Sequence, residues 1–246
     1  MSVLLLRLAG PMQAWGTQSR FSVRDTGLEP SKSGVVGLLC AALGKPRDES
    51  LRPDLPPLRA LASLRMAVRI DRPGVLMSDY HTACNVAIAS STPGRPAKLK
   101  ECEPSTRYYL ADADFLVGLE GPLDLLTVLD RALAHPVWLL FLGRKSFVPS
   151  VPVRVPDGLL PDARLPDALL TQPWLKRSNR DKPPQTLRLV AESASLIHGE
   201  PRNDIPLDFH RPRRRFAARR VEDLPLWPLP DHLVKEWPAC TSPSSS

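Results

Sequence analysis

The first 44 residues constrain the fold most strongly, because a strand, a long loop and a helix follow one another there. Residues 3–8 are almost continuously apolar, which is typical of a central strand buried on both faces. The next segment, residues 9–30, has no helical period and is interrupted by glycine and proline, so it is predicted as a loop. Apolar side chains then recur at helical spacing from residue 35 to residue 43, and Gly44 is placed to end this helix.

The start of this helix carries the polar sequence Ser31-Lys32-Ser33-Gly34. Ser31 or Ser33 can accept hydrogen bonds from the first free amides of the helix, and a helix N-terminus beside a lysine attracts anions. The Gly-x-x-x-x-Gly segment that precedes Lys-Ser in a P-loop is missing, which excludes nucleotide hydrolysis. We therefore expect a phosphate-bearing ligand, and nucleic acid above all.

Charge and cysteine content agree with this interpretation. The net charge of +7 and the pI of about 9.5 favour a polyanionic partner. No window approaches the about 20 apolar residues that span a membrane, and residues 3–6 are too short for a signal peptide, so we expect a cytoplasmic protein without membrane contact. The four cysteines form no Cys-x-x-Cys pair, so we expect neither a zinc site nor another metal or cofactor, and Cys40 is predicted as a small buried apolar residue.

The order of elements up to residue 150 predicts the fold. After the first strand and helix, alternation predicts strands over residues 64–70 and 75–79, joined by a turn at Arg72-Pro73-Gly74. Further strands are predicted at residues 107–110, 114–119 and 137–142, and an amphipathic helix at residues 123–134. The order β-α-β-hairpin-β-α-β predicts an α+β domain of the ferredoxin-like, RRM type over residues 1–150.

An insertion interrupts this order at residues 80–105. It has no core-like period, and it contains Pro93-Gly94-Arg95-Pro96 followed by Lys98 and Lys100. An insertion of this length inside a compact fold usually serves a function. We expect a basic hairpin that protrudes from the domain.

The pattern weakens beyond residue 148. We predict a smaller, mostly β region over residues 151–240, with a helix at 167–171 and strands at 186–191 and 215–221, and a disordered tail at 241–246. Residues 210–220 hold six arginines and no acid, which favours contact with RNA or an acidic subunit over a merely solvated strand edge. These are Arg211, Arg213, Arg214, Arg215, Arg219 and Arg220.

Four motifs, together with a weaker fifth, carry a family resemblance. They are Leu6-Arg7-Leu8-Ala9-Gly10-Pro11-Met12-Gln13-Ala14-Trp15-Gly16, Ser33-Gly34-Val35-Val36-Gly37-Leu38-Leu39, Asp79-Tyr80-His81-Thr82, Leu142-Gly143-Arg144-Lys145-Ser146 and, more weakly, Arg107-Tyr108-Tyr109-Leu110-Ala111-Asp112-Ala113. In this order they resemble the CasD subunits of type I-E CRISPR Cascade, which are RAMP proteins. The resemblance covers residues 1–150 and thins beyond them to the segment Phe216-Ala217-Ala218-Arg219.

The resemblance implies a non-catalytic role in RNA binding. Proteins of this family grip the repeat-derived 5′ handle of crRNA at one end of Cascade. They pack against the backbone subunit CasC and help to seat the large subunit CasA, and the assembled complex recognises target DNA. A thumb-like hairpin is expected to cross the RNA, and it falls at residues 80–107 here.

The expected RNA contacts combine cations on phosphates with stacking on splayed bases. The phosphate-binding candidates are Arg24, Lys32, Arg107, Arg144 and Lys145. Ser33 and the Gly34 amide are expected to hydrogen-bond a phosphate or base edge, and Trp15 and Tyr108 either stack on bases or fill the core. The remaining RNA-binding candidates are Gln13, Tyr80, His81, Gly143 and Ser146.

Two other functions compete with this one. A metal-independent endoribonuclease that processes precursor crRNA needs a general acid and base, which His81, Tyr80 and Lys145 could supply. A purely structural adaptor would touch protein partners and little RNA. The cation-rich glycine turns favour RNA binding over the adaptor, and we expect no catalytic residue.

Overall fold

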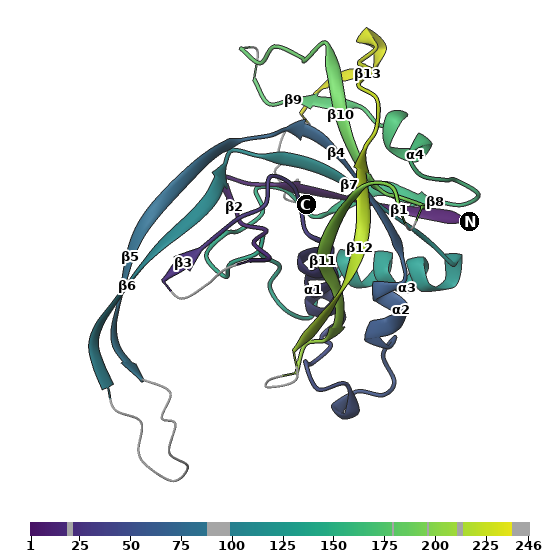
Figure 1. Cartoon of the computed structure of the whole chain (residues 1–246). Coiled ribbons are helices and arrows are strands. Elements are labelled where there is room, and N and C mark those ends of the chain that lie inside the picture. The colour runs from purple at the N-terminus through teal and green to yellow at the C-terminus, as the bar shows by residue number, and fades with distance from the viewer. Residues whose placement is uncertain (19–21, 88–98, 179, 196, 211–213, 238–246) are drawn as a thin grey trace, which may run out of the picture.

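The structure is a computed structural model of the chain, and it describes residues 1–18, 22–87, 99–178, 180–195, 197–210 and 214–237. Helices combine with mainly antiparallel sheets, so the predicted α+β class is confirmed at that level. In the described parts, the main sheet has the order β11-β12-β10-β4-β7-β1-β8, with β13 beside β10 (Figure 1). Its strands are β1 (Ser2–Ala9), β4 (Arg65–Arg72), β7 (Asp114–Gly121), β8 (Arg154–Leu160), β10 (Thr186–Glu192), β11 (Glu200–Asp208), β12 (Arg215–Asp223) and β13 (Trp227–Pro228).

Strand β1 is buried along its whole length because both faces of the sheet are covered. Leu4, Leu6 and Leu8 pack into the core with helices α1 (Lys32–Leu43) and α3 (Leu123–Ala134). Val3 and Leu5 pack on the opposite face, in the cluster that includes helix α4 (Asp167–Leu170) and strand β9 (Trp174–Lys176). This alternation explains why the segment is apolar at almost every position.

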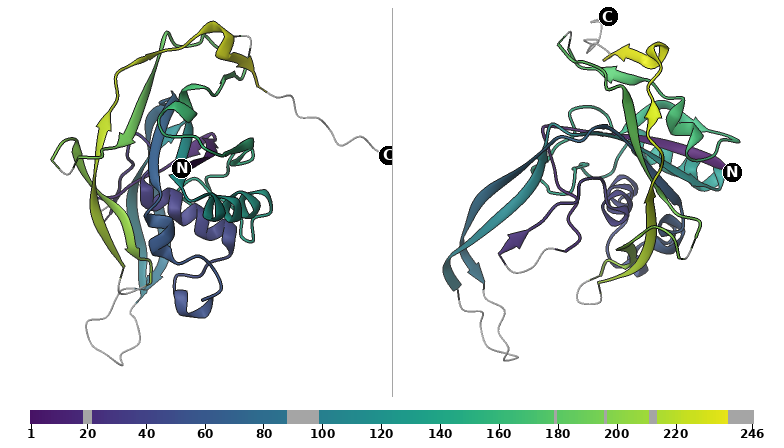
Figure 2. Two further views of the ribbon diagram at one scale, coloured as in Figure 1. Left: turned by 90° about the vertical axis from the view of Figure 1, so that its right-hand side faces the viewer. Right: turned by 45° about the horizontal axis from the view of Figure 1, so that its top comes forward.

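Smaller elements complete the fold. A second sheet contains β2 (Met12–Gln13), β3 (Val23–Arg24), β5 (Val75–Ala87) and β6 (Leu99–Ala111), and β9 pairs in parallel with β14 (Val234–Glu236). Helix α2 (Leu58–Ala62) and two 3₁₀ turns, Glu49–Leu51 and Asp231–Leu233, lie in the connections. Strand β11 contacts both α1 and α2, so the far edge of the main sheet curls round beside these helices (Figure 2).

The prediction of a strand at residues 137–142 is wrong. Residues 137–142 form an irregular segment, because the amides of Val137 and Trp138 donate to the carbonyls of Ala42 and Ala41 at 3.0 and 3.1 Å. These hydrogen bonds satisfy the C-terminal end of α1. The edge of β1 pairs with β8 instead, so strands from both sides of residue 150 share one sheet.

The inserted segment forms a long hairpin that extends away from the body of the protein (Figure 1). Strands β5 and β6 pair from Val75–Ala111 to Ala87–Leu99, so the hairpin begins several residues before the predicted insertion. Pro93-Gly94-Arg95-Pro96 and Lys98 lie outside the described residues, as do the tail at 241–246, Arg211 and Arg213.

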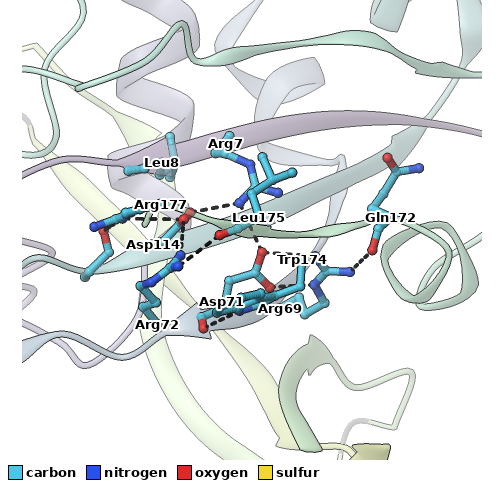
Figure 3. A network of polar contacts seen from close by, with 12 residues as sticks. Arg7, Leu8, Arg69, Asp71, Arg72, Asp114, Gln172, Trp174, Leu175 and Arg177 are labelled. Atoms are coloured by element: carbon cyan, nitrogen blue, oxygen red, sulfur yellow. Dashed lines mark hydrogen bonds and ion pairs between the residues drawn. The ribbon is translucent and has the colours of Figure 1, made fainter. Parts of the chain in front are cut away.

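A network of buried charges ties the main sheet together (Figure 3). Arg7 on β1 lies 3.0 Å from both Asp71 and Asp114, on strands β4 and β7. Arg69 donates to Asp71 at 2.6 Å, and Arg72 donates to Asp114 at 3.2 Å. Arg69 also donates to the carbonyl of Leu169 in α4 and to those of Gln172 and Pro173 just after it, which anchors α4 and the segment that leads to β9 against the sheet.

No helix in the described parts of the chain is long and apolar enough to cross a membrane.

Candidate nucleic-acid interface

Gln13 and Trp15 lie in the interior and not on an RNA-facing surface, which corrects their prediction as RNA contacts. The Gln13 side chain donates to the carbonyls of Leu8 and Ala113 at 2.8 and 2.9 Å, and it accepts from the Trp15 indole at 3.1 Å. Trp15 is 2% exposed, and a Cβ atom on Gly34 would approach its ring to 2.8 Å. Trp15 therefore fills the core beneath α1, as the alternative interpretation of this residue proposed.

The N-terminal end of α1 is occupied by groups of the chain itself. Ser31 Oγ accepts from the Gly34 amide at 3.3 Å, and an Asp204 carboxylate oxygen accepts from the Lys32 amide at 2.7 Å. Lys32 is 3% exposed, and its Nζ lies 2.7 Å from Glu192. Burial lowers the pKa of Lys32, and the charge of Glu192 opposes this shift. The Asp204 carboxylate therefore occupies the position at which a phosphate was predicted. Lys32 is buried in an ion pair and is not available to RNA.

The arginine-rich segment at 210–220 also divides into different roles. Arg219 is buried and donates two hydrogen bonds to Asp204, at 2.6 and 2.9 Å. Arg220 donates to the Gly199 carbonyl at 2.7 Å, and Arg214 lies over the ring of Phe216. The contact with RNA or an acidic subunit that was expected of this segment is therefore not open to Arg219, which pairs with an acid from β11.

Three other arginines meet at the base of the hairpin, and we call them the basic cluster: Arg24, Arg107 and Arg144. Arg24 on β3 and Arg107 on β6 are register partners in parallel strands. Arg144 reaches them from the turn after residue 142, where its guanidinium donates to the Tyr108 carbonyl at 2.7 Å and to the Arg24 carbonyl at 3.4 Å. Segments far apart in the sequence thus bring three predicted residues together.

The cluster concentrates positive charge. Burial lowers the pKa of Arg144 most, and the charges of Arg107 and Arg24 lower it further, whereas Asp25 and Asp79 raise it. Neighbouring like charges repel each other unless an anion is close. The two aspartates offset part of the repulsion, and a phosphate group would offset more.

The two faces of the hairpin differ. Arg107 is opposite Asp79, and His81 is two residues further along the same strand, so these three side chains share one face. The His81 Nδ1 atom lies 3.5 Å from Asp79. Tyr80 and Tyr108 occupy the other face, where both are exposed, Tyr80 by 74%. The structure thus separates these two tyrosines, of which Tyr108 was predicted to stack, from the cations.

A groove of about 760 Å³ lies beside the basic cluster, between α1 and the segment at 137–145. Four predicted residues line it: Ser33, Gly34, Gly143 and Lys145. The aromatic side chains of Trp138, Phe141 and Phe209 and the cations Arg47 and Arg214 also line it. Arg214 was already named in the arginine-rich segment, but sequence reasoning missed Arg47 and the three aromatic residues. Trp138 was missed because its apolar surroundings resembled a buried strand, whereas its side chain is 47% exposed.

Gly143 has a structural reason of its own. Its φ is +90°, and a Cβ atom there would fall 1.7 Å from the Ala14 carbonyl oxygen. Gly143, an RNA-binding candidate, is therefore required by a close contact with the protein's own backbone. Lys145 and Ser146, which follow in the same turn, are exposed.

Across the described residues, no three His, Cys, Asp or Glu side chains are grouped as metal ligands would be.

Comparison with known proteins places these features in a family. The family model described as "CRISPR-associated protein (Cas_Cas5)" matches residues 3–222. The Escherichia coli (strain K12) protein "CRISPR system Cascade subunit CasD" is 38% identical over 157 residues, which are 59% of this chain and 66% of that relative.

Two solved structures are similar over nearly the whole chain. "Crystal structure of Cas protein" has a TM-score of 0.69 and 43% identity, covering 96% of this chain and 99% of that chain. "CRISPR RNA-guided surveillance complex" has a TM-score of 0.71 and 33% identity, covering 95% and 93%. The match to the family model spans the β-α-β-hairpin-β-α-β order and also β10, β11 and nearly all of β12. The chain therefore belongs to the CRISPR-associated Cas_Cas5 family and is of the CasD type.

Proposed function

We propose that this protein is the non-catalytic Cascade subunit that binds and caps the 5′ handle of crRNA. In this role it contacts the backbone subunit CasC and the large subunit CasA, so that the assembled complex recognises foreign DNA through its crRNA. The observation that carries the proposal is the basic cluster, where Arg24, Arg107 and Arg144 converge from three segments at the base of an exposed hairpin. Similarity to a protein named as a Cascade subunit supports the same role.

The topology supports the finer fold that this role needs. The order β1-α1-β4-β7-α3-β8, with β4-β7-β1-β8 adjacent in the sheet, is that of a ferredoxin-like domain. The β5–β6 hairpin between β4 and β7 would then be the thumb. Strands β10 to β12 would extend the sheet on the side where they brace α1.

The proposed path of the RNA follows from the positions of the cations. Arg144 and Lys145 are adjacent in one turn, so a strand that lies in the groove at Lys145 passes directly to the basic cluster. Arginine guanidinium groups bind phosphate oxygens in bidentate fashion, which holds the backbone without reading sequence. Tyr108 and Tyr80, on the opposite face of the hairpin, would stack on a base that the hairpin displaces.

Removal of two exposed cations and the half-buried Arg107 tests the proposal. The triple variant Arg24→Ala/Arg107→Ala/Lys145→Ala leaves the buried ion pairs and the Arg144 guanidinium in place. Each lost phosphate contact lowers the slope of log affinity against log salt by about 0.7 for single strands, so we expect a slope smaller by about 2 for handle RNA.

The matched control is Arg131→Ala, which removes an exposed arginine from α3, on the body of the protein rather than on the hairpin (Figure 1). Its affinity and salt slope should equal those of the wild type. An unchanged slope in the triple variant, with normal folding, would refute RNA binding by this surface and favour the adaptor function.

The contact between His81 and Asp79 supports the second candidate, an endoribonuclease. A carboxylate 3.5 Å from the imidazole could orient it as a general base. Purified protein incubated with labelled repeat RNA tests this function directly. Cleavage at one site that is lost in His81→Ala, with RNA affinity retained, would replace the non-catalytic role, whereas intact RNA supports it.

A further inference from the structure

The hairpin carries two free cysteines directly opposite each other. Cys84 on β5 and Cys102 on β6 are register partners, and both are exposed. Directly opposed residues of an antiparallel pair point to the same face, with Cβ atoms about 4.5–5.5 Å apart. A disulfide needs Cβ atoms about 3.5–4.5 Å apart and Cα atoms within about 6.8 Å. A small approach of the two strands therefore brings the sulfur atoms into bonding distance.

The third described cysteine has the opposite character. Cys40 is buried in helix α1, and burial raises the pKa of its thiol to about 12. A thiol in this environment does not form the thiolate that attacks a disulfide. Cys40 is therefore not expected to react with small disulfides, whereas the two hairpin cysteines are accessible to them.

We propose that Cys84 and Cys102 form a reversible redox site, a cross-strand disulfide that opens and closes by exchange with a low-molecular-weight disulfide such as oxidised glutathione. One cysteine thiolate attacks a sulfur of the small disulfide, forms a mixed disulfide and releases one small thiol. The second cysteine then attacks the protein sulfur of that mixed disulfide and releases the other small thiol. The protein loses two electrons and two protons, and one small disulfide becomes two thiols.

The site lies in the part of the hairpin that is farther from the body of the protein. The last described pair of the hairpin is Ala87–Leu99, so the cysteine pair lies toward the outer end of the two strands. Arg107 lies nearer to the body along β6, so closure would join the strands without altering the cations of the basic cluster. An exposed disulfide of this kind is labile and reversible rather than a structural bond.

Mass spectrometry of the full-length protein tests the proposal. Reduced protein is incubated with oxidised glutathione, the remaining thiols are blocked with a maleimide, and the digest is searched for a peptide that links Cys84 to Cys102. We expect conversion of most molecules to a species lacking two hydrogen atoms, at a rate independent of protein concentration and reversed by dithiothreitol. Hydrogen exchange of the outer hairpin should slow on oxidation.

Matched variants make the outcome decisive. The link should be absent in Cys84→Ser and in Cys102→Ser, which exchange exposed side chains of similar size, and present in Cys40→Ser and Cys240→Ser. Stable glutathione adducts on both hairpin cysteines without a link would overturn the proposal, as would links formed only between two molecules. RNA affinity plays no part in this readout, so failure here leaves the proposed function untouched.

Discussion

Asp204→Ala tests whether the start of α1 is held by the chain's own charges. The Asp204 carboxylate is 1% exposed and accepts three hydrogen bonds, one from the Lys32 amide and two from the Arg219 guanidinium. Removal of this carboxylate leaves the buried Arg219 guanidinium with Glu192, at 3.2 Å, as its remaining acidic partner. It also leaves the Lys32 amide at the start of α1 without its acceptor. The perturbation therefore breaks a buried ion pair and a helix cap at once.

The expected loss follows from these two terms. Removal of one partner of a buried ion pair costs about 3–5 kcal/mol. Loss of a capping acceptor costs about 1 kcal/mol more. Because Glu192 still compensates part of the Arg219 charge, we expect the free energy of unfolding to fall by about 4 kcal/mol. This is a large share of the about 5–15 kcal/mol that holds a typical domain together.

Urea unfolding, followed by circular dichroism, measures the loss. The matched control is Asp223→Ala, because Asp223 also binds an arginine through two hydrogen bonds, to Arg188 at 2.6 and 3.1 Å. The Asp223 side chain is 59% exposed, so its pair should contribute only about 0–1 kcal/mol. Equal losses in the two variants would refute the argument that burial makes the Asp204 contacts important.

Three further predictions concern single residues. Ala at Gly37, where a Cβ atom meets nothing within 4 Å, should raise the free energy of unfolding by about 1 kcal/mol, and a loss in urea titration would contradict this. Ala at Gly143 should lower it by about 1–3 kcal/mol and weaken RNA binding, because the turn must move away from Ala14; unchanged values in both assays would count against this. Cys40 should react with a maleimide only after unfolding, and because its folded pKa of about 12 exceeds the ordinary 9.0, the contribution of this thiol to stability should fall as the pH rises from 9 toward 12. Fast labelling of native protein at Cys40 would contradict the last prediction.

The local pattern of apolar residues was enough to predict the elements whose burial it reflects. The continuous apolar run of β1 follows from burial on two faces, and the helical spacing in α3 follows from burial on one face, whereas α1 is buried around most of its circumference. The hairpin was also predictable, because residues 80–105 lack the apolar period of a core segment. The family motifs contain Arg107 and Arg144, and Arg24 was a candidate as a cation in the predicted loop, so all three were named before the structure showed them together.

Tertiary structure alone decided which polar residues reach the surface. Lys32 has the sequence context of a phosphate ligand. Its amide instead donates to Asp204, which lies 172 residues away along the chain, and its ammonium group forms an ion pair with Glu192. Residues 137–142 have the composition of a strand, but the amides of Val137 and Trp138 donate to carbonyls in the last turn of α1. Composition determines what a segment can do, whereas long-range hydrogen bonds and ion pairs decide what it does, because each buried polar group must find a partner wherever the fold supplies one.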